Sequence, residues 1–306
     1  MTTSRFTLAP VDVLVGVDGS ENSELALHTA LSIAREHGLS VRLVGAYNVP
    51  VIPHRHAPVI SHDHHRGVAH ATQDRLEEYA AAARSTGVDA VAQAIEGDAS
   101  GVLVDASRFA RLTVVGRRGR NNTPGRLIGT VSGRVVAHAH SPVLVVPLGG
   151  EDDTHTAGAS EPDKDIVAGV DLGSTAQPVA EAAATAAELT GSRLTLLSVA
   201  PTGTRWPLSE ERRDEADAQL RAAHSQHVDE LTATVAAAHP RLEVRSRVED
   251  GSPAEALVAA ARTATAVVVG TRGRGGFASL LLGSVSRDVL NEAASPVLVV
   301  PTKSRR

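Results

Sequence analysis

The chain repeats itself, and this repeat limits the folds open to it more than any other feature. The segment SPVLVVP at residues 141–147 returns unchanged at 295–301, which is 154 residues later. Gly129 and Gly283 are separated by the same 154 residues. Chance similarities would not keep a constant spacing across separate segments, so the sequence predicts a duplicated domain.

A polar linker is expected between the two copies. The segment GGEDDTHTAGASEPD at 149–163 is acidic, rich in small residues and without hydrophobic periodicity. We therefore predict one domain over residues 1–150 and a second over 160–306. Each is long enough to bury a hydrophobic core of its own.

Short apolar segments alternate with longer alanine-rich segments within each copy. The runs VLVGV and AVVVG have no polar face, which is typical of strands buried beneath helices on both sides of a parallel sheet. The pattern predicts an α/β fold of two tandem, doubly wound, parallel five-stranded sheets. The strands are expected near 12–17, 41–47, 88–96, 112–116 and 143–147 in the first copy, and near 165–170, 193–199, 242–249, 265–270 and 297–301 in the second.

The segments between the strands have the features of helices. SELALHTALSIAREHG and AEAAATAAELTG both end in glycine, as many helices do at the C-cap. Ser174 and Gln177 have the spacing of a capping box, which predicts the start of the helix that follows.

A glycine-rich segment after the fourth strand of each copy points to chemistry. A glycine at the carboxyl end of a strand lets backbone N–H groups approach a ligand, and the N-terminus of the next helix favours an anion. Neighbouring arginines add positive charge. A tight turn alone would not need the third glycine, so we predict phosphate binding in both copies. The motif G-x2-G-x9-G-[S/T] comprises Gly116, Gly119, Gly129 and Thr130 in the first copy and Gly270, Gly273, Gly283 and Ser284 in the second.

An aspartate ends the first strand of each copy, at Asp18 and Asp171. In open parallel sheets, ligands bind beyond the carboxyl ends of the strands where the winding reverses, so the loops after strands one and four can share one crevice. The aspartate would then hold the ribose or a Mg²⁺ ion that accompanies the phosphates. The alternative is that each aspartate only caps the following helix.

Several classes of protein lose support from the sequence. Neither glycine segment ends in G-K-[S/T], and G-x-G-x-x-G does not follow the first strand, which argues against P-loop kinases and dinucleotide-dependent oxidoreductases. The net charge of −5 and the scarcity of aromatic residues argue against a nucleic-acid-binding protein.

The absence of cysteine excludes disulfides and thiolate metal sites. No apolar run approaches the roughly 18–20 residues of a membrane-spanning helix. The first residues also lack the pattern of a secretory signal. We therefore expect a cytoplasmic protein without a membrane partner.

These motifs resemble those of the universal stress protein family, in particular its tandem, ATP-binding branch. The resemblance covers nearly the whole chain, twice, and the G-x2-G-x9-G-[S/T] motif is the family's marker for nucleotide-binding members. It implies strand order 3-2-1-4-5 and a bound adenine nucleotide, ATP or else AMP or ADP, together with Mg²⁺. It also implies pairing through the closing strand VLVVP, as a pseudo-dimer within the chain and as a homodimer.

The resemblance also implies where the nucleotide is held. Adenine contacts fall on Ala46 and Val199, at the end of the second strand of each copy. Phosphate contacts fall on the motif glycines, on the residues after the third glycine and on the serines that follow. The predicted nucleotide-binding residues are Val17, Asp18, Ala46, Gly116, Arg118, Gly119, Gly129, Thr130, Val131 and Ser132 in the first copy, and Val170, Asp171, Val199, Gly270, Arg272, Gly273, Gly283, Ser284, Val285 and Ser286 in the second; Asp18 and Asp171 are also the candidate Mg²⁺ ligands.

The favoured function is an adenine-nucleotide-binding stress regulator whose bound state changes its surface or assembly. A slow ATPase or phosphotransferase is the first alternative, although no pair of residues stands out as base and nucleophile. The second alternative is an interaction scaffold with vestigial nucleotide sites.

Three further segments have simpler interpretations. Residues 54–70 contain six histidines, which could bind a transition metal but are interpreted as a solvated, mobile loop. Trp206 is predicted to be a local packing anchor. The charged helix expected at 211–238 is interpreted as exposed surface.

Overall fold

The computed structural model describes residues 8–48, 62–119, 128–148, 165–202, 210–273 and 282–302. These residues form two compact units. The described residues up to Leu148 belong to the first unit, and those from Asp165 onward belong to the second. The predicted linker, residues 149–163, lies outside the described residues.

The first unit is a parallel sheet with strand order β3-β2-β1-β4-β5. Its chain therefore winds outward from β1, returns to the other side of β1 and continues outward, as predicted. Its elements are β1 (Val11–Gly16), α1 (Glu21–His37), β2 (Val41–Tyr47), α2 (His62–Ser85), β3 (Ala90–Glu96), α3 (Ala99–Ala106), the 3-10 helix η1 (Ser107–Phe109), β4 (Ala110–Gly116), α4 (Thr130–His138) and β5 (Val143–Val146).

The second unit repeats this topology, with order β8-β7-β6-β9-β10 and parallel pairing throughout. The expected strand order 3-2-1-4-5 is thus confirmed in both units. Its elements are β6 (Asp165–Gly169), α5 (Ala176–Thr190), β7 (Arg193–Ala200), α6 (Glu210–Ala238), β8 (Val244–Asp250), α7 (Pro253–Ala260), β9 (Ala266–Gly270), α8 (Ser284–Glu292) and β10 (Val297–Val300).

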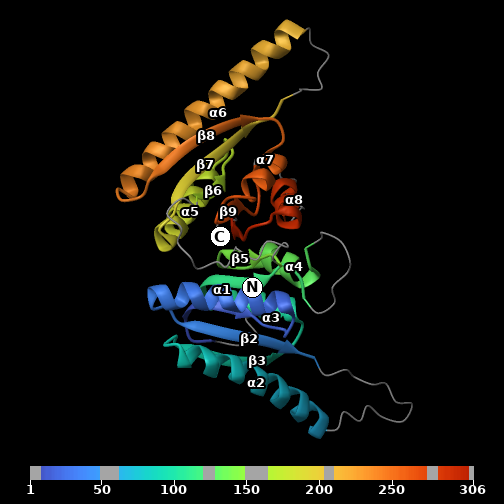
Figure 1. Ribbon diagram of the computed structural model, residues 1–306. Helices are drawn as coiled ribbons and strands as arrows, with labels where there is room; N and C mark the ends of the chain where they lie inside the picture. Colours follow the sequence, from blue (N-terminus) through green and yellow to red (C-terminus); the bar gives the residue numbers. More distant parts are fainter. Residues whose placement is uncertain are drawn as a thin grey trace, which may run out of the picture. The chain divides into compact units, whose positions relative to one another are not determined.

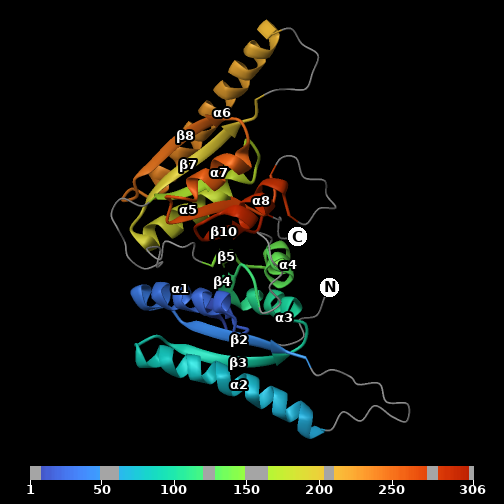
Figure 2. The ribbon, with the colours of Figure 1, turned by 45° about the vertical axis from the view of Figure 1, so that its right-hand side comes forward.

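Helices cover both faces of each sheet. Because crossovers between parallel strands are right-handed, reversing the direction of winding moves the connecting helices to the opposite face. The long helices α2 and α6 lie along β3 and β8 in their respective units (Figure 1). The shorter helices pack in pairs, α3 with α4 and α7 with α8 (Figure 2). None of the helices in the described ranges is both long and apolar enough to cross a membrane.

The central strands form the core of each unit. Leu14 and Leu43 are fully buried in the first unit, and Leu194 and Leu196 are fully buried in the second. Burying a side chain of this size contributes about 1.5–3 kcal/mol. The continuously apolar strand segments are therefore explained by helices on both faces.

The helix ends confirm one sequence prediction and correct another. Gly38 and Gly191 end α1 and α5 in the left-handed conformation, with φ of 62° and 60°, as their C-cap positions predicted. The predicted capping box at Ser174 and Gln177 is wrong. Helix α5 begins at Ala176 after Thr175, which makes no side-chain cap hydrogen bond.

The histidine-rich segment is also corrected in part. Helix α2 begins at His62, so the second half of the predicted loop is helical instead. Residues 54–61 and Trp206 lie outside the described residues, so the interpretations placed on them stay predictions.

A histidine with two carboxylate partners joins the end of α6 to α5. The Nε2 atom of His239 lies 3.2 Å from Glu181 Oε2, and its Nδ1 atom lies 3.0 Å from Glu188 Oε1. Hydrogen bonds to Glu188 and then to Glu181 raise the pKa of His239 above its ordinary 6.5. The protonated ring can donate to both carboxylates at once.

Stability of the second unit is therefore expected to depend on pH. Because the folded pKa of His239 is raised, its contribution is fully present below pH 6.5 and is lost as the pH rises through the folded pKa. The carboxylates are partly exposed, so we expect about 1 kcal/mol or less. Urea unfolding at a series of pH values should show this loss in the wild type and not in His239→Gln. Equal pH dependence in both proteins would contradict the assignment.

Candidate functional site

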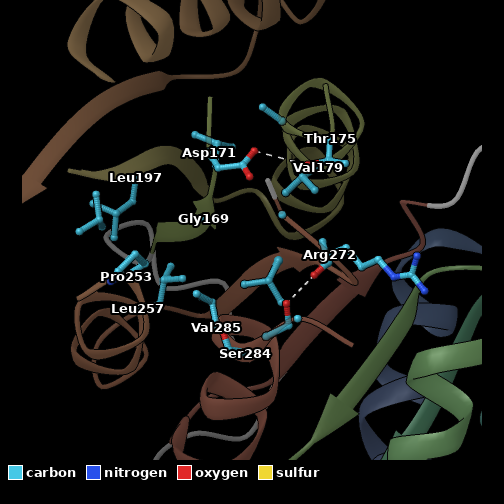
Figure 3. A pocket seen from close by; sticks show the side chains of 18 of the residues that line it. Gly169, Asp171, Thr175, Val179, Leu197, Pro253, Leu257, Arg272, Ser284 and Val285 are labelled. Carbon is cyan, nitrogen blue, oxygen red and sulfur yellow. Dashed lines mark hydrogen bonds between the residues drawn. The ribbon is translucent and has the colours of Figure 1, made fainter. Parts of the chain in front are cut away.

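A cavity of about 610 Å³ lies at the carboxyl ends of β6, β7 and β9 in the second unit (Figure 3). Its volume falls within the roughly 300–1,000 Å³ typical of small-molecule sites. The loops after β6 and β9, the first turn of α8 and side chains from α6 and α7 line it. The lining includes all ten second-copy residues predicted from the sequence, namely Val170, Asp171, Val199, Gly270, Arg272, Gly273, Gly283, Ser284, Val285 and Ser286.

The carboxylate of Asp171 lies between the start of α5 and the glycine segment. Its Oδ1 atom accepts hydrogen bonds from the backbone N–H of Gly173 at 2.9 Å and from Thr175 Oγ1 at 3.4 Å. A Cβ atom at position 273 would lie 2.8 Å from Asp171 Oδ2. Asp171 and Gly273 are therefore in contact at the carboxyl end of the sheet. A side chain at position 273 would displace the Asp171 carboxylate.

The N-terminus of α8 opens into the same cavity. Gly283 is the N-cap residue and has no side chain to accept from the first N–H groups of the helix. Its own N–H donates to Thr271 O at 2.8 Å, and Ser286 Oγ donates to Gly270 O at 2.6 Å, so the first turn is fastened to the end of β9. These bonds aim the positive end of the helix dipole at the cavity, which favours an anion there.

The first unit has the same arrangement. Asp18 Oδ1 accepts from Ser20 N at 3.0 Å and from Ser20 Oγ at 2.6 Å, and a Cβ atom at Gly119 would lie 2.6 Å from Asp18 Oδ2. The N–H of Gly129 donates to Arg117 O at 2.9 Å, and Ser132 Oγ donates to the same oxygen at 2.8 Å. The duplicated sequence therefore produces a duplicated local geometry.

Neither aspartate is itself the N-cap of the next helix. In the first unit Ser20 caps α1 by accepting from the backbone N–H of Ser23, and Asp18 holds Ser20. In the second unit Thr175 is the N-cap residue of α5, and Asp171 accepts from its hydroxyl group. The capping alternative thus accounts for one oxygen of each carboxylate, while the other oxygen faces a glycine of the motif.

The remaining first-copy residues surround the same strand ends. Val17 is buried and continues the pairing with β2, Ala46 is half-buried near the end of β2, and the Arg118 backbone lies beside Gly129. Thr130 begins α4, and the next side chain, Val131, is 37% exposed although apolar. The second-copy residue at this position, Val285, lines the cavity.

Comparison with known proteins follows the same two-part division. The profile of the universal stress protein family matches residues 12–147 and, a second time, residues 164–301. The chain belongs to the universal stress protein family. It is 30% identical to the universal stress protein Rv1996 of Mycobacterium tuberculosis, over 94% of each chain, and 31% identical to one of Mycolicibacterium smegmatis, over 94% of this chain and 96% of that one.

A solved universal stress protein agrees in fold. The crystal structure of a universal stress protein from Archaeoglobus fulgidus covers 95% of this chain and 98% of its own, with a TM-score of 0.69 at 22% identity. The tandem α/β architecture is therefore shared with this family member.

The first glycine of the motif has a packing role in both units of this universal stress protein. A Cβ atom at Gly116 would lie 2.6 Å from the backbone oxygen of Asn22, in the first turn of α1. A Cβ atom at Gly270 would lie 2.7 Å from the Thr302 Cγ2 atom. Close packing against backbone therefore explains the glycine at position 116, whereas at position 270 the closest neighbour is a side-chain methyl group.

Arg272 lines the cavity, but its side chain points away from the other labelled lining residues (Figure 3). In Figure 3 its side chain extends away from Leu197 and Pro253, so the guanidinium lies far from the apolar end of the cavity. Its Nε atom is buried without a hydrogen-bond partner among the described residues. The sequence predicts a cation near the glycine segment; Arg272 does line the cavity, with its guanidinium directed away from the other labelled residues (Figure 3).

Sequence reasoning missed part of the cavity wall, including the only histidine in its described lining. His224 lines the cavity from α6 and is only 6% exposed, with its Nδ1 atom 2.8 Å from Ser198 Oγ. The interpretation of 211–238 as exposed surface is therefore wrong along one stripe. His224, Val228, Leu231 and Val235 are all buried, and their 4-3-4 spacing within a charged helix was the available signal.

Proposed function

We propose that each unit of this universal stress protein binds one adenine nucleotide and that the protein acts as a nucleotide-dependent regulator of a stress response. The observation that carries the proposal is the second-unit cavity. A carboxylate, a glycine segment, a helix N-terminus and an apolar wall converge there in one space of suitable volume. The first unit repeats the carboxylate, the glycines and the helix N-terminus.

The parts of a nucleotide match the parts of the cavity. The phosphates would lie against the first turn of α8 and the glycine segment, where N–H groups and the helix dipole favour negative charge. Asp171 would meet the ribose, which offers hydroxyl donors to a carboxylate. The base would lie against Val199, Leu257 and neighbouring apolar side chains. By the same logic Asp18 and Ala46 would hold the ribose and base in the first unit.

Mg²⁺ would enter with the phosphates. Within the described ranges, no three His, Cys, Asp or Glu side chains come together as a metal site. Mg²⁺ is commonly held by one or two carboxylates together with substrate phosphates and water, and one carboxylate stands at each glycine segment. Asp18 and Asp171 thus fit an ion that is held mainly by the nucleotide. Dimerisation through the closing strands stays a prediction.

A regulator would use the nucleotide as a conformational ligand. ATP would shift the protein toward the state that binds ATP better, by no more than its differential affinity for the two states.

The identity of the bound small molecule tests the proposal. Purified protein is denatured and the released molecules are identified by mass spectrometry, with an adenine nucleotide expected at up to two per chain. Added ATP at about 100 times its dissociation constant should stabilise the folded units by about 2.7 kcal/mol, visible as a raised melting temperature. No released nucleotide together with no shift would favour the scaffold alternative. Sustained phosphate release over many turnovers would favour the ATPase alternative.

A further inference from the structure

The cavity of the second unit has two chemically different ends. The glycine segment follows β9, whereas His224 packs over β7, and β6 lies between these two strands. With strands about 4.8 Å apart, the two ends are separated by roughly 10 Å. Leu197, Pro253 and Leu257 lie together at the end away from the Arg272 guanidinium (Figure 3). A nucleotide with its phosphates at the glycine segment would therefore place its base toward the β7 end.

His224 brings a polar ring to this otherwise apolar end. The other polar side chains of the described lining come from the loops after β6 and β9 and from α8. His224 is also the only aromatic ring among the described lining residues. A few placed polar groups in a mostly apolar pocket commonly fix the orientation of its ligand.

The ring of His224 is held in one orientation by a chain of hydrogen bonds. Ser198 Oγ donates to Val170 O at 3.1 Å, and a carbonyl oxygen can only accept. The hydroxyl has a single proton, so at the 2.8 Å contact Ser198 Oγ accepts from His224 Nδ1–H. The neutral ring therefore carries its proton on Nδ1, and Val170 ties the chain to the strand end beside Asp171.

The first unit lacks this pair. Gly45 is the residue that faces α2 at the corresponding place, and a Cβ atom there would lie 3.0 Å from Leu76 Cδ1 and 3.3 Å from Thr72 Cγ2. Thr72 instead donates its hydroxyl proton to Val68 O within its own helix. The first unit thus has the pair Gly45 and Thr72 where the second unit has the pair Ser198 and His224. The two sites therefore differ at the end that would hold the base, and they share the end that would hold the phosphates.

We propose that His224 is a specificity-determining residue of the second site, where its ring contacts the base and ribose half of the nucleotide, with Ser198 as the positioning residue. The inference rests on the proposed nucleotide binding. It makes the second site the more selective of the two for the nucleoside part of its ligand. The first site would depend more on the phosphates and on apolar contact.

The test compares two probes in the full chain, with the first site silenced by Gly129→Asp. ATP presents base, ribose and phosphates, whereas inorganic tripolyphosphate presents phosphates alone. The double variant Ser198→Gly, His224→Thr gives the second unit the pair of the first. Calorimetry with Mg²⁺ should show that its affinity for ATP is about tenfold lower, which corresponds to about 1.4 kcal/mol. The affinity of the same variant for tripolyphosphate should change by less than about twofold.

Further variants separate recognition from structural support. Ser198→Ala should lose part of the ATP affinity, and Ser198→Thr, which keeps the hydroxyl, should regain it. Unchanged ATP affinity in the swapped variant would overturn the inference, and so would equal losses for ATP and tripolyphosphate, because these would indicate support of the β6 loop. If neither probe binds with His224 and Ser198 in place, the proposed function itself fails. Melting without nucleotide checks that the swapped pair folds.

Discussion

Gly283→Asp is expected to abolish nucleotide binding by the second unit while leaving that unit at least as stable as before. Asp is a better N-cap residue than Gly by a few tenths of a kcal/mol, and a negative charge at a helix N-terminus adds about 0.3–1 kcal/mol. The nearest atom to a Cβ at this position is Thr271 O at 3.5 Å, and φ is −67°, so the new side chain has room.

The same substitution opposes a phosphate in two ways. The new carboxylate would accept from the N–H groups at the start of α8, which the phosphate would otherwise use. It would also stand against the phosphate charge, and two like charges about 4 Å apart repel by about 4 kcal/mol near a protein surface. We expect ATP affinity to fall by roughly 100-fold or more. Calorimetric titration measures the affinity, and thermal melting without nucleotide measures the stability.

A neutral replacement separates the two effects. Gly283→Asn offers the same capping geometry without the charge, so it should lower the affinity for ATP less than Gly283→Asp does. Gly129→Asp makes the matched change in the first unit and should leave the second site intact. Wild-type ATP affinity at the second site of Gly283→Asp would show that the phosphates do not lie at α8, and the proposed phosphate position would be wrong.

The fold could be predicted from the sequence because the patterns that indicate it lie within short segments and occur in both copies of the repeat. The constant offset between repeats predicts two units, and the continuously apolar strand segments predict parallel sheets with helices on both faces. The sharing of one crevice by the loops after the first and fourth strands could also be predicted. It follows from the winding rule once the strands are assigned.

Other parts of the site depend on contacts between distant segments. The ring of His224 is oriented by Ser198, which lies on another element. The charged sequence around His224 gives no sign of this contact. The start of α5 was misplaced because Asp171 organises the turn before it, and the capping-box rule considers only residues within one turn. The need for glycine at position 116 arises from Asn22, which is far away in sequence.

Gly116→Ala is expected to destabilise the first unit far more than Gly270→Ala destabilises the second, although both glycines open the same motif. At Gly116 the added methyl group would lie 2.6 and 2.7 Å from the backbone oxygen and carbon of Asn22, so the first turn of α1 must move. At Gly270 its nearest neighbour is the methyl group of Thr302, which ends a side chain near the described C-terminus. Overpacking costs about 1–3 kcal/mol, and we expect the upper part of that range for Gly116→Ala and the lower part for Gly270→Ala.

Urea unfolding of the full chain measures both losses, with Gly101→Ala as a control in the first unit. Gly101 lies in α3, where a Cβ atom would approach nothing closer than Asp98 Oδ2 at 3.7 Å, so alanine should be neutral or stabilise by up to about 1 kcal/mol. Equal losses at positions 116 and 270 would show that α1 yields as easily as the side chain of Thr302. If the loss at 116 is large, glycine is needed at the first motif position for the packing of α1 on β4, and the third motif glycine is the one whose substitution reports on phosphate binding. Nucleotide affinities of Gly116 variants would then measure folding of the unit as much as contact with the ligand.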